Sequence, residues 1–193
     1  MRHHIAPAFR LMLVLTVLTG LIYPGVVTAL CQVLFHWQAN GSMVKVAGKK
    51  IGSALIGQNF AKPEYFHPRP SSAGNDGYDS TASGASNYGP TNQKLIDRVK
   101  ASLEQFRKEN PDYTGPIPAD LLTASASGLD PDISPASAEA QAARVAKARD
   151  TSVDNVEQLI RRNTKGPDLG FLGEPRVNVL KLNLELDRQF PHS

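Results

Sequence analysis

Residues 11–37, LMLVLTVLTGLIYPGVVTALCQVLFHW, decide the architecture of this chain, because the stretch contains no Asp, Glu, Lys or Arg. It is longer than the roughly 20 apolar residues that an α-helix needs to cross a bilayer. Trp37 lies at its end, where an indole ring favours the headgroup level. The sequence therefore predicts one N-terminal transmembrane helix over 11–37, preceded by a short tail over 1–10.

Three residues in the middle of this stretch are unusual for a helix: Gly20, Pro24 and Gly25. They would bend a soluble helix, but transmembrane helices tolerate them where neighbours satisfy the backbone groups that are set free. We therefore expect this helix to pack against other membrane helices.

A cleaved signal peptide is the alternative interpretation of the same residues. Arg2 and Arg10 provide a basic start, and Val27-Thr28-Ala29 resembles a small-residue cleavage site. The apolar run, however, exceeds the core of about 7–15 residues that signal peptides use, and cleavage would leave an apolar new terminus. A retained anchor is the better interpretation.

The orientation of the anchor follows from its flanks only in part, because basic residues lie on both sides. These are Arg2 and Arg10 before the run, and Lys45, Lys49 and Lys50 after it. A short basic tail before an apolar core usually stays in the cytoplasm, and large following domains are translocated largely regardless of charge. We therefore predict a cytoplasmic tail over 1–10 and an extracytoplasmic domain over 38–193.

The part after the anchor is expected to be a single soluble α+β domain. Residues 43–62 favour one or two short strands interrupted by glycines. The stretch Pro63–Pro90 is rich in proline, glycine and small polar residues, which excludes long regular elements. Its aromatic residues predict an ordered, packed loop rather than a flexible linker; they are Tyr65, Phe66, Tyr78 and Tyr88.

Three helices are expected further on. The first begins after Thr91 or Asn92 and ends at Asn110-Pro111, since apolar residues recur at helical spacing between them. The second begins at Ser134-Pro135 and runs to about Ala148. The third begins at Thr151, with Asp154 as its capping-box partner, and ends before Gly166-Pro167. The last segment, Val177–Leu186, is typical of a strand, or of a strand followed by a helix.

Composition excludes several functions. A net charge of +3 from 21 basic and 18 acidic residues is too small and too dispersed for nucleic-acid binding. No glycine-rich loop ends in lysine and Ser or Thr, so the chain is not expected to be an ATPase by itself. The five histidines are scattered and the one cysteine, Cys31, lies in the apolar run. We therefore expect no metal site and no catalytic residue.

Two small motifs could provide a catalytic or cation-binding site. Ser42 and Lys45 form an S-x-x-K pair, in which a lysine amine can activate a serine, so a membrane-tethered Ser/Lys hydrolase is an alternative function. Asp130-Pro131-Asp132 could offer carboxylates to a cation, but aspartate on either side of proline is typical of turns and helix caps.

Five segments lie in order behind the predicted membrane helix, and we call them the five motif segments. They are Gly52–Gln58 (GSALIGQ), Tyr65–Ser71 (YFHPRPS), Ser83–Asn87 (SGASN), Ser125–Pro135 (SASGLDPDISP) and Gly173–Leu180 (GEPRVNVL). Taken together they resemble a single family, the C subunit of the Kdp potassium-importing P-type ATPase. Ala85 and Ala126 stand where the family pattern has glycine.

The resemblance implies an accessory subunit in the bacterial inner membrane. Its expected partners are an ATP-hydrolysing pump subunit, a channel-like potassium subunit, a small additional membrane subunit and membrane lipid. The family's C subunit is described as a catalytic chaperone that raises the ATP affinity of the pump subunit, with the glutamine at Gln58 proposed to contact the nucleotide.

That chaperone role conflicts with the predicted orientation, because ATP is cytosolic and residues after 38 are expected outside. An external brace or gate at the potassium entrance of the channel subunit is therefore the alternative. A single transmembrane helix cannot by itself enclose an ion path.

Overall fold

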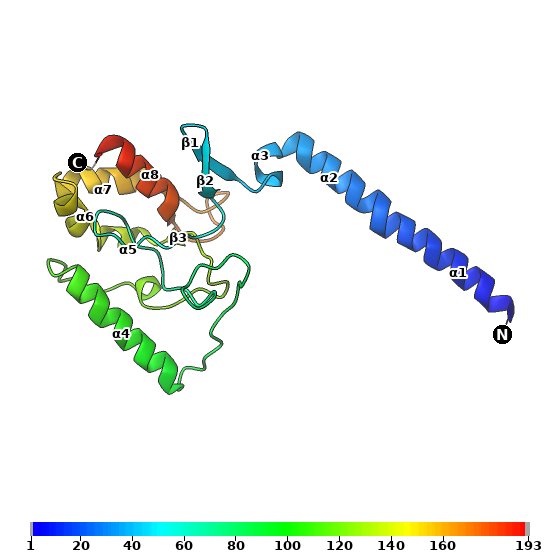
Figure 1. Ribbon diagram of the computed structural model, residues 1–193, viewed down its shortest axis with the longest axis horizontal. Helices are drawn as coiled ribbons and strands as arrows, with labels where there is room; N and C mark the ends of the chain where they lie inside the picture. The colour runs from blue at the N-terminus through cyan, green and yellow to red at the C-terminus, as the bar shows by residue number, and fades with distance from the viewer. Residues whose placement is uncertain (1, 192–193) are drawn as a thin grey trace. The chain divides into compact units, whose positions relative to one another are not determined.

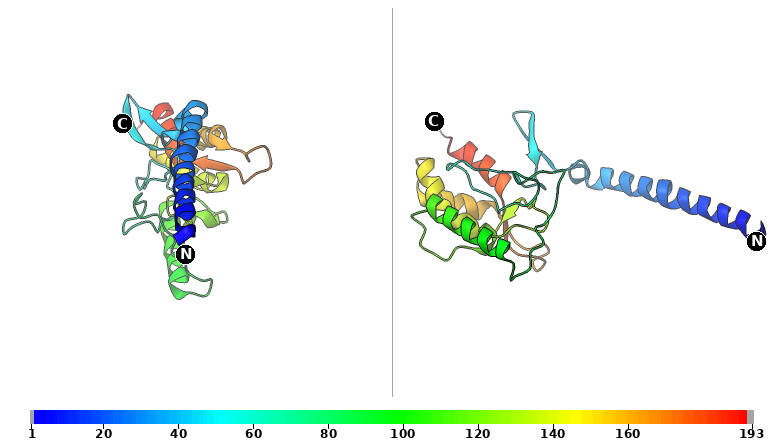
Figure 2. Two further views of the ribbon diagram at one scale, coloured as in Figure 1. Left: turned by 90° about the vertical axis from the view of Figure 1, so that its right-hand side faces the viewer. Right: turned by 60° about the horizontal axis from the view of Figure 1, so that its bottom comes forward.

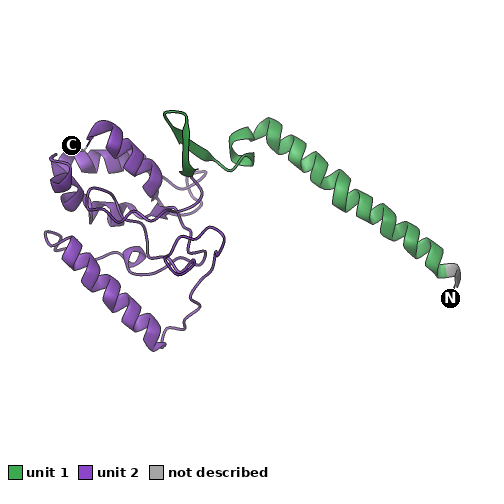
Figure 3. Ribbon diagram, in the orientation of Figure 1, with its two compact units in different colours: residues 1–53 green, residues 54–193 purple. Residues whose placement is uncertain are grey.

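The computed structural model describes residues 2–191, which belong to two compact units, Met1–Ser53 and Ala54–Ser193 (Figure 3). The first unit begins with α1 (Arg2–Val17), η1 (Leu18–Ile22) and α2 (Tyr23–Leu34), which follow one another without a break (Figure 1). The span His4–Leu34 is long and apolar enough to cross a membrane, with a mean hydropathy of 2.0. The predicted anchor is thus a helix that begins closer to the N-terminus than residue 11.

The turn η1 is π-helical; it contains Gly20 and ends two residues before Pro24. The Tyr23 N–H donates to the Leu18 carbonyl, five residues back instead of four. Proline at 24 has no N–H to give and crowds the preceding turn, which a wider turn accommodates. The helix therefore continues through Pro24 instead of ending there.

After α3 (His36–Ala39), the first unit ends in a hairpin of β1 (Met43–Val46) and β2 (Lys49–Ser53). Met43 pairs with Ser53 and Val46 with Lys49. The two turn residues, Ala47 and Gly48, both have positive φ, 48° and 80°. This is the turn geometry whose twist suits a two-residue hairpin. The strands expected within 43–62 are therefore present and end at Ser53.

The second unit has a core of four helices and a small antiparallel sheet (Figures 1 and 2). The helices are α5 (Pro135–Glu139), α6 (Ala142–Ala148), α7 (Val153–Asn163) and α8 (Val179–Gln189). The strands β3 (Asp132–Ile133), β5 (Arg176–Asn178) and β4 (Thr164–Lys165) lie in that order. Phe66, Val145, Val156, Leu182 and Leu186 are each fully buried between them. The predicted α+β class is confirmed.

Helix α4 (Gln93–Glu109) packs on a second, smaller cluster through Phe106, together with Leu121 of the short helix η2 (Ala119–Leu121) and Ala140. Its cap is Asn92, whose side chain accepts from the Lys94 N–H at 2.9 Å. The expected start and end of this helix are both confirmed.

Two details differ from the sequence-based expectation, and a third decides between two alternatives that the sequence left open. The single helix expected from Ser134 to Ala148 is two helices, because the chain turns at Ala140 and Gln141 and so brings Gln141 against His67. Helix α7 is capped by Ser152, which accepts from the Asn155 N–H at 3.2 Å, and not by Thr151. The last segment is the strand followed by a helix, β5 and α8, that alternation alone did not distinguish from one strand.

The stretch Pro63–Pro90 is an ordered loop, as its aromatic residues predicted. Its first part is held by side chains from the helices, which bind five consecutive backbone positions. Arg144 donates to the carbonyls of Pro63 and Tyr65, and Arg149 donates to that of Glu64. Asn183 accepts from the N–H of Phe66 and donates to its carbonyl. Gln141 makes the same two bonds with His67. These are buried partners for backbone groups that no strand or helix satisfies.

Candidate functional site

Four of the five motif segments contact the fifth, Ser125–Pro135, in the second unit. Separate contacts tie the other segments to it. They are Gly57 N to Leu129 O at 2.8 Å, Ser71 Oγ to Gly128 O at 2.6 Å, Gly84 N to Ser127 O at 2.9 Å, and Asn178 Nδ2 to Asp132 Oδ1 at 3.1 Å. Segments far apart in the sequence therefore form one surface, and we take this surface as the candidate functional site.

Glycines make this meeting point possible. A Cβ at Gly57 would lie 2.5 Å from Cε1 of Tyr78 and 2.6 Å from the backbone oxygen of Asp130. At Gly128, where φ is +66°, a Cβ would lie 2.8 Å from the Ala73 nitrogen. Neither position has room for a side chain, so the segments approach each other backbone to backbone.

A shallow groove of about 630 Å³ runs along this surface, and we call it the motif groove. Its lining is mostly small or apolar, and its two charged groups, Arg69 and Asp130, are paired with each other at 2.7 Å. The lining residues are Leu55, Ile56, Arg69, Ala124–Ser127 and Leu129–Pro131. Leu55 is 60% exposed at its edge. Such a surface offers shape and apolar contact more than charge.

Gln58 follows the groove residues Leu55 and Ile56 and the fixed Gly57, in a segment without regular structure. Its side chain is half-buried and makes no hydrogen bond to another residue within 2–191. The Gly57 anchor holds the backbone of Gln58 in place. The side-chain amide is thus available for a contact outside the chain.

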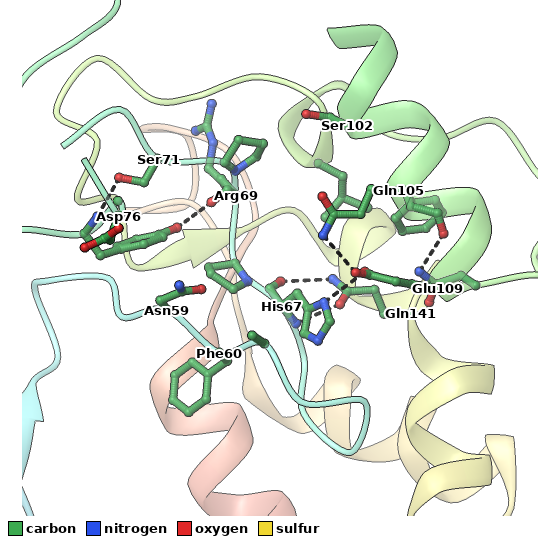
Figure 4. Close-up of a pocket in the computed structure, with 18 of the residues that line it drawn as sticks. Asn59, Phe60, His67, Arg69, Ser71, Asp76, Ser102, Gln105, Glu109 and Gln141 are labelled. Carbon is green, nitrogen blue, oxygen red and sulfur yellow. Dashed lines mark hydrogen bonds and ion pairs between the residues drawn. The ribbon is translucent and has the colours of Figure 1, made fainter. Parts of the chain in front are cut away.

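On the other side of Gln58 in the sequence, Asn59 lines a second, polar cleft of about 420 Å³ (Figure 4). The loop bearing His67 forms one wall of this cleft and helix α4 forms another. His67 Nδ1 lies 3.2 Å from Glu109 Oε2, and His67 Nε2 lies 3.0 Å from the Lys62 carbonyl oxygen. Gln105 donates to the other carboxylate oxygen of Glu109 at 2.9 Å.

Both ring nitrogens of His67 therefore face acceptors. A neutral imidazole can donate through only one nitrogen, so both contacts are satisfied together only when the ring carries two protons. The hydrogen bond from His67 lowers the pKa of Glu109, against an opposing effect of burial, and Gln105 lowers it further. The wall of the cleft thus carries an ionised carboxylate next to a histidine.

Arg144 of α6 connects two residues that line the cleft to the start of the Pro63–Pro90 loop. It donates to Asn110 Oδ1 at 3.0 Å and to Gln141 Oε1 at 2.7 Å, besides its loop carbonyls. Burial lowers the pKa of Arg144 to about 10, which leaves the guanidinium charged at neutral pH. Its hydrogen bonds to neutral oxygens offset part of the cost of burying that charge.

Tyr78 lines the polar cleft beside Arg69, which lines both the cleft and the motif groove. Its hydroxyl donates to the Arg69 carbonyl at 2.5 Å, and its backbone N–H donates to Ser71 Oγ at 2.8 Å. Burial raises the pKa of Tyr78, and the nearby Asp130 carboxylate raises it further. The phenol is therefore a neutral structural donor.

The residues singled out for hydrolase chemistry are not arranged for it. Ser42 is fully buried with a φ of 49°, and its Oγ has no hydrogen-bond partner within the described chain, whereas Lys45 is exposed on β1. A serine nucleophile needs its base within hydrogen-bond reach. The structure does not bring this pair together.

Asp130 forms a turn, as its proline context predicted, whereas Asp132 lies on strand β3 and the cap of the following helix is Ser134. Asp130 accepts from the Asp132 N–H at 3.0 Å and pairs with Arg69, while Asp132 accepts from Asn178 and lies 3.4 Å from Arg176. Over residues 2–191, no cluster of three His, Cys, Asp or Glu side chains is placed to hold a metal ion.

Whether the motif surface fits ATP depends on the hydrogen-bond donors and cations that it presents. A triphosphate needs backbone N–H groups or cations that face it. Here the amides of Gly57 and Gly84 donate to carbonyls within the surface, and Arg69 is paired with Asp130. The surface does not fit a triphosphate, and the amide of Gln58 is the group it could offer to another part of a nucleotide.

The sequence singled out Gln58, which stays a prediction, but it did not reveal the polar cleft or the buried polar side chains beside it. Gln141 lies in the turn between α5 and α6, and Arg144 and Asn183 lie on α6 and α8; both Gln141 and Asn183 are 1% exposed. A buried amide on an apolar stripe was the available signal, since such a group needs a partner inside the protein.

Comparison with known proteins gives one consistent result. Residues 5–188 match the family model described as "KdpC: K+-transporting ATPase, c chain". A protein of Myxococcus xanthus named potassium-transporting ATPase KdpC subunit is 56% identical over 184 residues, which cover 95% of this chain and 87% of the relative. Proteins of the same name from Methylococcus capsulatus and Rhodospirillum rubrum are 53% and 56% identical. They cover 97% and 96% of this chain, and 98% and 95% of their own lengths.

Proposed function

The chain belongs to the KdpC family, the c chain of K+-transporting ATPases, and from this membership we propose that it is a non-catalytic accessory subunit that supports assembly of the pump. In this proposal α1, η1 and α2 anchor the chain in the bacterial inner membrane. The second unit binds a partner subunit through the motif groove. ATP is used by the complex as a whole.

The observation that carries this proposal is the composition of the motif groove. The segments by which the chain resembles its family converge on a surface of small and apolar residues whose charges are internally paired. Depletion of unpaired charge with well-fixed backbone is typical of the core of a protein–protein contact. Potassium or triphosphate recognition would call for oxygen cages or free donors instead.

We further propose that the second unit lies outside the cytoplasm, as the short basic tail predicts. The groove would then bind the channel-like subunit near its potassium entrance, as an external brace. The pump subunit and a small additional membrane subunit complete the proposed assembly.

A charge placed in the groove tests this function. Ala126 is an exposed groove residue, so Ala126→Arg adds bulk and charge to the groove without disturbing the core. We expect it to reduce the amount of this chain that co-purifies with the pump. Ala136→Arg, at an exposed position of α5, is the matched control and should co-purify normally. Normal co-purification and potassium-dependent ATPase activity of Ala126→Arg would contradict the proposal.

Gln58 favours a second candidate function, that of raising the ATP affinity of the pump subunit. Its support is the half-buried amide without a hydrogen bond in the described chain, held on a fixed backbone. Gln58→Ala should then raise the ATP concentration needed for half-maximal activity and leave assembly intact. Gln93→Ala, at an exposed residue of α4, is the control. An unchanged ATP dependence of Gln58→Ala would exclude this function.

A further inference from the structure

The loop between β4 and β5, residues 166–175, presents large apolar side chains to solvent. Leu169 is 83% exposed, Phe171 74% and Leu172 50%, and the first two are the most exposed large hydrophobic residues of the described part of the second unit. We call this loop the apolar tip. Side chains of this size, gathered at one place on a surface, are typical of a contact with something outside the chain.

The apolar tip is ordered although it protrudes. The N–H and carbonyl groups of Asp168 and Leu172 pair with each other at 2.8 and 2.9 Å. The Asp168 carboxylate is held by Lys165 at 2.6 Å on one side and by Arg176 at 2.9 Å on the other. Leu169, between them, has a φ of 55°. The leucine and phenylalanine side chains are therefore held outward by a closed turn.

The tip is connected to the place where the membrane tether joins the second unit. Its second stem is β5, and Asn178 at the end of β5 donates to the carbonyl of Ala54 at 2.9 Å. Ala54 is the first residue of this unit. Residues 35–53 link it to the apolar helix, and even fully extended they would span only about 65 Å. The tether therefore keeps this end of the unit within reach of a bilayer.

The charges beside the tip suit a bilayer with anionic lipids. Between residues 161 and 176 there are four cations and two carboxylates. Arg161 and Arg162 in the last turn of α7 and Lys165 on β4 are exposed, although Arg161 lies 3.3 Å from Glu157 and Lys165 pairs with Asp168. Basic residues flanking apolar and aromatic ones are the composition by which peripheral segments bind the headgroup region.

We propose that the apolar tip inserts Leu169, Phe171 and Leu172 into the boundary between the headgroups and acyl chains of the bilayer, with the neighbouring cations against anionic phosphates. The contact goes beyond the proposed function, because it gives the second unit an attachment to lipid that is separate from the motif groove. It would limit how the unit rotates on its tether.

A fluorophore at the tip tests this contact in the assembled complex. Phe171→Cys in a Cys31→Ser background is labelled with an environment-sensitive dye, and the complex is reconstituted into vesicles of phosphatidylcholine and phosphatidylglycerol. Glu104→Cys, on the exposed face of α4, is the matched control. We expect the emission at 171 to shift to shorter wavelength and to lose intensity to brominated lipid, whereas the emission at 104 responds to aqueous iodide.

Two outcomes would overturn the proposal. Quenching of the label at 171 by iodide, with none by brominated lipid, would show that the tip is in water. Protection from both quenchers would show that the tip is covered by a partner protein. Neither outcome depends on the motif groove, so failure here is distinguishable from failure of the Ala126→Arg test.

Discussion

Single residues set the tightest constraints where the motif segments meet. Gly57 is the clearest case, because its missing side chain lets the backbone donate to Leu129 while Tyr78 and Asp130 close over it. The resemblance to the family identified this glycine within a motif, but its role follows only from the packing. No local pattern in the sequence says that residues 57, 78 and 130 are in contact.

We predict that Gly57→Ala lowers the free energy of unfolding by about 1–3 kcal/mol, because the new methyl group overlaps a backbone oxygen that cannot move away easily. Thermal unfolding of the purified full chain in detergent measures this. Gly89→Ala is the control, since a Cβ at Gly89 meets nothing within 4 Å. Equal stabilities of the two variants would refute the close approach at Gly57.

Glu109 gives a prediction about pH. Its pKa is lowered in the folded state by the hydrogen bond from His67, so the carboxylate stabilises the fold above its unfolded pKa, which is the ordinary glutamate value of about 4.5. That contribution is lost as pH falls through the lower, folded pKa. The stability advantage of the wild type over Glu109→Gln should therefore shrink between neutral pH and pH values below about 4.5. A constant difference across this range would mean that the contact with His67 contributes nothing.

At the scale of elements, helix caps followed from neighbouring residues, whereas contacts between residues far apart in the sequence were not predicted. Ser134, and either Thr91 or Asn92, were predicted as caps because a cap bonds to a backbone group two or three residues away, and Ser134 and Asn92 make these bonds. Gln141 and Asn183 were not predicted to hold the loop, because their partners, His67 and Phe66, lie 74 and 117 residues away. The break between α5 and α6 was missed for the same reason, since it serves a contact that the local sequence does not contain.

Asn183 on α8 tests how the ordered loop is held. Its amide pairs with the buried N–H and carbonyl of Phe66 at 2.8 and 3.0 Å. Asn183→Ala leaves both groups without a partner and should cost about 2–4 kcal/mol of stability. Asn155→Ala, at an exposed residue of α7, should cost much less. Amide hydrogen exchange would report whether residues 63–67 open in the Asn183 variant, and unchanged protection there would contradict the clamp.

The π-helical turn at η1 is also an element-scale feature. The sequence predicted that Gly20 and Pro24 would be tolerated within a continuous helix, and the structure shows the wider turn by which this happens. The expected packing of this region against other membrane helices stays a prediction.

For the whole molecule, hydropathy alone predicted the anchor, because an apolar run of this length has few alternatives. The α+β class followed from helical spacing and caps. Which side of the membrane holds the second unit does not follow from the fold. The flanking charges are balanced, and the proposed brace and the proposed nucleotide contact require opposite sides.

Topology therefore decides most directly whether the second unit works from outside the cytoplasm, as we propose for an accessory subunit. Glu104→Cys in a Cys31→Ser background places one exposed thiol on α4. Intact cells carrying the assembled pump are treated with a membrane-impermeant maleimide, with a cytosolic protein thiol as the control for leakage. We expect residue 104 to be labelled on intact cells. Labelling only after the cells are lysed would contradict it.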